Sequence, residues 1–153
     1  MRKIAIKYGL LMFAGFTFFF LIMHLLGQSQ NYILRVFNGV IHLGLITFAI
    51  REYRKQNPDG ISNHLSGVAM GIYTSVIGVV GFTIFMVLFL SGNTAFMASM
   101  KATLPLGEYL NPITASLYIL VEGTAVSVIG SYILTRLVDM NLTEKGEWSP
   151  FQK

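Results

Sequence analysis

Two ionisable side chains lie deep inside apolar stretches of this sequence, where they could do chemistry. Glu122 is near the middle of the run ITASLYILVEGTAVSVIGSYILTRL, and His42 is within the run NYILRVFNGVIHLGLITFAI. A carboxylate in the middle of a bilayer costs roughly 2.5 to 3.5 kcal/mol or more to insert, so it must be protonated, paired or in contact with water. An apposed carboxylate and imidazole can pass a proton or hold a polar substrate.

A polar stripe accompanies His42. At about 100° per residue, Asn31, Arg35, Asn38 and His42 fall on one helical face in a stripe roughly 60° wide. Glu122 and His42 each lie about ten residues in from the outer ends of their runs. We therefore predict an intramembrane polar cluster of Glu122, His42 and Asn38. One interpretation of this cluster is functional: a relay for protons or ions, or a site for a polar substrate. The other is structural: a buried polar contact that fixes the register of the helices or binds another subunit.

Arg35 lies about one helical turn below the outer surface, so its guanidinium can snorkel to the headgroups. The alternative is an anion or lipid-headgroup contact built from Arg35 and Asn31. No metal site is expected, because no close ligand pair such as His-x-x-x-His or Glu-x-x-His occurs. The chain has no cysteine, which excludes a disulfide framework, a thiolate metal site and a cysteine nucleophile. No cofactor is expected.

Apolar blocks of about twenty residues carry these side chains. Hydrophobic residues make up 54% of the chain and charged residues 12%, and short polar segments separate the blocks, which is a membrane pattern. We predict an all-α membrane protein with a single domain of four transmembrane helices at residues 5–26, 31–52, 63–91 and 112–137, followed by a cytoplasmic tail at 138–153. The short loop at 27–30 makes the first two spans a hairpin.

The outer loop between the third and fourth spans contains a mixed run in which Phe96, Met97, Met100 and Leu104 recur at helical intervals. This pattern predicts an interfacial helix. Asn111 and Pro112 then suit the N-cap and first position of the fourth span.

The distribution of Lys and Arg predicts the orientation. With the N-terminus inside, nine lie in inner segments and only Lys101 lies in an outer loop. The nine inner residues are Arg2, Lys3, Lys7, Arg51, Arg54, Lys55, Arg136, Lys145 and Lys153. Under the positive-inside rule, we expect a multi-pass protein with both termini facing the cytoplasm.

The third and fourth spans also carry small residues along one face each, which lets helix backbones approach closely in lipid. We predict that these seams pack the two spans together or bind a partner. Their members are Gly67, Gly71, Ser75, Gly78, Gly81, Gly123, Ser127 and Gly130.

The run IREYRKQNPDGIS at 50–62 and the Lys-Tyr-Gly-Leu start at 7–10 carry a resemblance. They resemble a family of small four-span bacterial inner-membrane proteins, mostly from Bacteroidota, catalogued only as a domain of unknown function. The resemblance covers residues up to about 90 and implies the same four-span fold and a multi-pass location in the bacterial inner membrane. It implies no catalytic residue.

Enzyme activity is not expected, because the chain has neither a nucleophile elbow nor a Gly-rich phosphate loop after a strand. Nucleic-acid binding is not expected either, since the Lys and Arg behind the net charge of +4 sit at the ends of apolar blocks. We predict a non-catalytic accessory or interaction subunit of a membrane complex or homo-oligomer. The alternative is a small oligomeric transporter or channel with Glu122 and His42 as its polar site.

Overall fold

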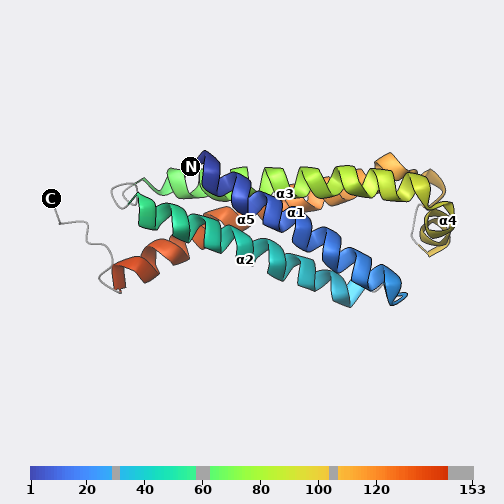
Figure 1. Ribbon diagram of the computed structural model, residues 1–153, viewed down its shortest axis with the longest axis horizontal. Coiled ribbons are helices and arrows are strands. Elements are labelled where there is room, and N and C mark those ends of the chain that lie inside the picture. Colours follow the sequence, from blue (N-terminus) through green and yellow to red (C-terminus); the bar gives the residue numbers. More distant parts are fainter. Residues whose placement is uncertain (29–31, 58–62, 104–106, 145–153) are drawn as a thin grey trace.

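The computed structural model describes residues 1–28, 32–57, 63–103 and 107–144, with side chains throughout except at 32–35. Within these ranges the chain forms α1 (Arg2–Leu25), α2 (Tyr32–Gln56), α3 (His64–Gly92), α4 (Thr94–Thr103), the short 3-10 helix η2 (Gly107–Tyr109) and α5 (Pro112–Glu144). The four long helices run along the length of the molecule, and α4 lies at the end opposite the N-terminus (Figure 1). The predicted all-helical fold is therefore confirmed.

Among the described residues, three helices are long and apolar enough to cross a membrane, namely α1, α3 and α5. The 25 residues of α2 would also cover about 38 Å at 1.5 Å per residue. However, α2 carries Asn38, His42, Arg51 and Glu52 and is the least apolar of the four long helices. Length and composition alone therefore identify three spans.

The central element of the bundle is α3, which contacts α1, α2, α4 and α5. Its glycines allow this close packing. A Cβ atom added at Gly78 would lie only 2.6 Å from Met12 Sδ of α1, and one added at Gly9 of α1 would lie 2.6 Å from Ile77 Cβ of α3. The α1 and α3 backbones therefore approach more closely than larger residues would permit.

The start of α5 follows the predicted capping pattern. Asn111 Oδ1 accepts hydrogen bonds of 2.9 Å from the backbone N–H groups of Ile113 and Thr114, and Pro112 is the first helical residue. Its missing N–H is not needed there. The prediction for this helix start is confirmed.

The end of α5 differs from the prediction. The helix continues to Glu144 rather than ending at 137, so the segment predicted as a cytoplasmic tail begins inside it. Val138 and Leu142 are spaced four residues apart and are both buried, which extends the buried face of the helix by two turns. The rest of the predicted tail, residues 145–153, lies outside the described residues.

The loop between α3 and α5 contains a helix, α4, where one was predicted. Met97 is buried and Phe96 packs against the core, whereas Leu104 lies outside the described residues. The Phe96 ring is 5.3 Å from the His24 ring of α1 and 5.8 Å from the Phe89 ring of α3, centroid to centroid. Aromatic contacts with two helices therefore hold α4 against the end of the bundle.

Candidate functional site: two buried polar centres

The first polar centre surrounds His42, which is only 4% exposed. Its Nε2 atom lies 3.1 Å from Ser75 Oγ of α3 and 3.2 Å from Ser127 Oγ of α5. The Phe16 ring of α1 meets the imidazole edge-on at 5.6 Å. One side chain of α2 thus contacts the other three long helices.

The hydrogen bonds of Ser127 assign the proton in this centre. Ser127 Oγ donates its own proton to the carbonyl of Gly123, one turn earlier in α5. Its oxygen can therefore only accept at the His42 contact, which places a hydrogen on Nε2. The Nε2–H group is then directed at the two serine oxygens.

Glu122 does not meet this centre. Its side chain is exposed on α5. Five residues separate Glu122 from Ser127, which corresponds to a rotation of about 140° around the helix. Asn38 lies one turn from His42 and is partly buried, and its Oδ1 atom is buried without a hydrogen-bond partner among the described residues. The structure therefore replaces the expected contact of Glu122 with His42 by two serine contacts.

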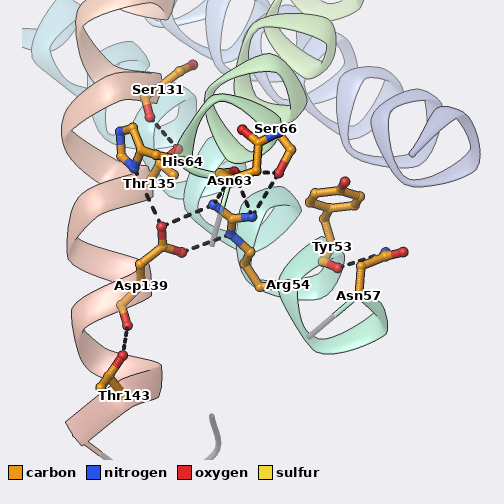
Figure 2. Close-up of polar contacts among 10 residues, drawn as sticks. All are labelled: Tyr53, Arg54, Asn57, Asn63, His64, Ser66, Ser131, Thr135, Asp139 and Thr143. Atoms are coloured by element: carbon orange, nitrogen blue, oxygen red, sulfur yellow. Dashed lines mark hydrogen bonds and ion pairs between the residues drawn. The ribbon is translucent and has the colours of Figure 1, made fainter. Parts of the chain in front are cut away.

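The second polar centre is an ion pair between Arg54 of α2 and Asp139 of α5 (Figure 2). Arg54 has no exposed side-chain surface. It donates from Nε to Asp139 Oδ1 at 2.8 Å and from Nη2 to Asp139 Oδ2 at 3.0 Å. This is a bidentate ion pair, in which two parallel hydrogen bonds join the guanidinium to the carboxylate.

The start of α3 completes the second centre. Arg54 Nη1 donates to Ser66 Oγ at 2.9 Å, and His64 Nδ1 lies 3.5 Å from Asp139 Oδ2. A Cβ atom at Gly67 would lie 2.7 Å from Arg54 Nη2, so only glycine leaves room for the guanidinium there. Figure 2 shows these groups from three helices converging on Arg54.

The two centres share one spacing. His42 with Ser127 and Arg54 with Asp139 are both 85 residues apart in sequence. Hence α2 and α5 run parallel and stay in register over twelve residues, which is about 18 Å of helix. Two polar contacts at fixed levels prevent either helix from sliding past the other by a turn.

The sequence prediction missed the second centre because Arg54 was grouped with the inner basic residues and Asp139 with the tail. A signal was nevertheless present. Positions 127, 131, 135 and 139 of α5 are Ser, Ser, Thr and Asp at intervals of four, and all four are buried. A polar stripe at helical spacing that continues into an assumed tail indicates that the helix, and its buried face, continue too.

The small-residue seams lie inside the bundle. Among the seam residues of α3, Gly67 and Gly71 face Thr135 and Ser131 of α5, whereas Gly78 and Gly81 face α1. Ser75 and Ser127 meet at His42, as described above. From α5, Gly123 faces Val79 of α3, and Gly130 faces Leu43 of α2. The seams therefore serve three different helix pairs.

The remaining predicted positions can be placed briefly. Asn31 lies outside the described residues, as does the side chain of Arg35. In the part of the chain that the structure describes, no three His, Cys, Asp or Glu side chains gather as a metal site would require.

These features define an all-helical protein with the apolar helices of a membrane protein, in which buried polar contacts connect the long helices. The chain belongs to the family described as "Protein of unknown function (DUF4199)", which matches residues 3–105. This confirms the predicted resemblance to a family without an assigned function. No curated protein and no solved structure gives a significant match. The family match ends before α5, so each polar centre joins residues inside it to one outside it.

Proposed function

We propose that α2 is a fourth transmembrane helix and that the chain is an inner-membrane protein with both termini in the cytoplasm. Two observations support this placement. The polar side chains His42 and Arg54 of α2 are turned into the bundle and bonded there, so they need not face lipid. Arg2 and Arg51 are exposed at one end of the bundle, whereas Lys101 is exposed on α4 at the other.

The topology can be tested directly because the chain has no cysteine. Single-cysteine variants Lys55→Cys and Lys101→Cys would be labelled with a membrane-impermeant maleimide in intact cells. We expect labelling of Lys101→Cys in intact cells, and labelling of Lys55→Cys only after lysis. Labelling of both before lysis would contradict the placement of α2.

Within this membrane placement, the protein acts as a non-catalytic accessory or interaction subunit. The observation that carries this proposal is that both polar centres are bonded within the chain. His42 is held by two hydroxyl groups, and Arg54 is held by Asp139. The hydroxyl protons of Ser127 and Thr135 go to carbonyls of their own helix, so they are not available for a relay along α5. Such groups connect helices, which is a structural role.

The transporter alternative depended on Glu122 and His42 sharing one site. In the structure Glu122 is exposed and His42 is buried, so the carboxylate and the imidazole do not form one site. Of the expected cluster, Asn38 is the residue that remains near His42. The subunit role is therefore the better supported of the two.

Purification and flux measurements separate the two roles. A tagged chain extracted from its native membrane in mild detergent should carry a stoichiometric membrane partner. In liposomes, the purified chain should give no proton flux above that of empty vesicles. The double variant Ser75→Ala with Ser127→Ala should lower thermal stability and partner recovery together. Proton flux that this variant abolishes without a change in stability would contradict the structural role.

A further inference from the structure

One end of the bundle carries a set of exposed cations from three helices, called here the basic rim. It comprises Arg2 and Lys3 of α1, Arg51 of α2, and Arg136 of α5. The start of α1 and the end of α2 lie at the same end of the molecule (Figure 1). Positive charge is thus presented around this end rather than on a single helix.

The acidic groups that the structure describes near the rim are largely neutralised within the chain. Glu52 Oε2 accepts from Lys7 Nζ at 2.8 Å and from the Tyr8 hydroxyl at 2.7 Å. Asp139 is paired with buried Arg54. Of the acids described at this end, Glu144 is the exposed one, and it lies two turns beyond Arg136 at the end of α5. The rim therefore has an excess of exposed positive charge.

Exposed apolar side chains continue from the rim along the same helices. They include Leu10 of α1, Phe48 of α2 and Ile129 of α5, each more than half exposed. Cations at the edge of an apolar surface match a molecule that has an anionic head and a hydrocarbon tail. An acidic protein segment would match the cations but not the apolar surface beside them.

We propose that the basic rim binds the headgroups of anionic phospholipids, whose acyl chains lie along the exposed apolar faces of α1, α2 and α5. This inference rests on the proposed membrane placement. Basic residues beside a membrane span attract anionic lipids, and the attraction is screened by salt. Bound lipid would surround the end of the bundle where Arg54 and Asp139 join α2, α3 and α5.

The test titrates short-chain phosphatidylglycerol or phosphatidylcholine into the detergent-solubilised full chain and follows the melting temperature. The charge variant is Arg2→Gln, Lys3→Gln and Arg51→Gln combined, which changes only exposed side chains. The control is Lys101→Gln on α4, at the opposite end of the bundle. We expect phosphatidylglycerol to stabilise the wild type at lower concentration than phosphatidylcholine does. Each removed charge should weaken its apparent affinity about fivefold, which is about a hundredfold for the triple variant.

Each other outcome has a distinct meaning. The headgroup site would be overturned if the two lipids had equal effects on the wild type. It would also be overturned if Lys101→Gln and the triple variant lost affinity equally. Either result would leave the membrane placement intact. No effect of either lipid would also overturn the headgroup site, and the maleimide labelling of Lys55→Cys and Lys101→Cys would show separately whether the membrane placement holds. Binding of an acidic peptide at the rim without binding of phosphatidylglycerol would make it a protein-docking surface and overturn the lipid assignment.

Discussion

Replacing Asp139 with Asn tests how much the second polar centre contributes to stability. The change keeps the side-chain shape but removes the charge that faces Arg54 Nε and Nη2 at 2.8 and 3.0 Å. Because Arg54 has no exposed side-chain surface, water cannot replace the lost carboxylate. Breaking a buried pair in this way costs about 3 to 5 kcal/mol. For a chain of this size, that corresponds to a fall in melting temperature of about 6 to 20 °C.

The assay is thermal unfolding of the purified chain in detergent, followed by circular dichroism. The matched control is Glu52→Gln, which removes a carboxylate from the more exposed pair of Lys7 and Glu52. Solvent already screens that pair, so the melting temperature should change little. If Asp139→Asn lowers the melting temperature no more than Glu52→Gln does, the reasoning from burial is wrong.

A double variant separates the cost of an unpaired charge from the cost of lost packing. Arg54→Met with Asp139→Leu replaces the pair by apolar side chains of similar size. Because neither charge then remains buried, we expect a stability equal to or above that of the wild type. A double variant as unstable as Asp139→Asn would show instead that the shape of the pair, together with its contact to Ser66, provides the stability.

Three further predictions concern packing and the first centre. Gly71→Val would place a Cβ atom against Ser131 and should lower the melting temperature by several degrees. The control is Gly44→Val, which should not lower it, because Gly44 has open space around it. Ser127→Ala removes one acceptor of the His42 Nε2–H and should lower the free energy of unfolding by about 1 kcal/mol. The melting temperature should then fall by a few degrees, and an unchanged melting temperature would contradict the hydrogen bond. Phe96→Ala removes the ring that α4 packs against α1 and α3, so amide hydrogen exchange should accelerate in Thr94–Thr103 but not in α3.

Local pattern was sufficient to predict the helices. The predicted starts at 31, 63 and 112 lie within one residue of the observed starts of α2, α3 and α5, because apolar run length and capping residues are local properties. The side chain of Asn111 caps α5 as expected. The end of α5 was predicted too early because Asp139 and the polar residues after it are typical of a tail. The burial of Asp139 depends on Arg54, which is 85 residues away.

The pairing of polar groups could not be predicted in the same way. Sequence spacing places His42 and Glu122 at similar depths, but depth does not define the rotation of one helix relative to its neighbour. In the structure, α5 turns Ser127 toward His42, and Glu122 lies about 140° away on the exposed face. Because Gly71 and Gly123 have no Cβ atom, α3 and α5 can make the close contacts that select this rotation.

The sequence by itself therefore determined the class of the protein: apolar, helical, and assembled from long segments with charge at their ends. These properties follow from hydrophobicity and periodicity within each segment. Only the tertiary structure decided that His42 is bonded to two serines and that Arg54 is bonded to Asp139. Those contacts depend on the relative rotation and height of helices far apart in the chain, and close packing across all of the helix interfaces together selects that arrangement.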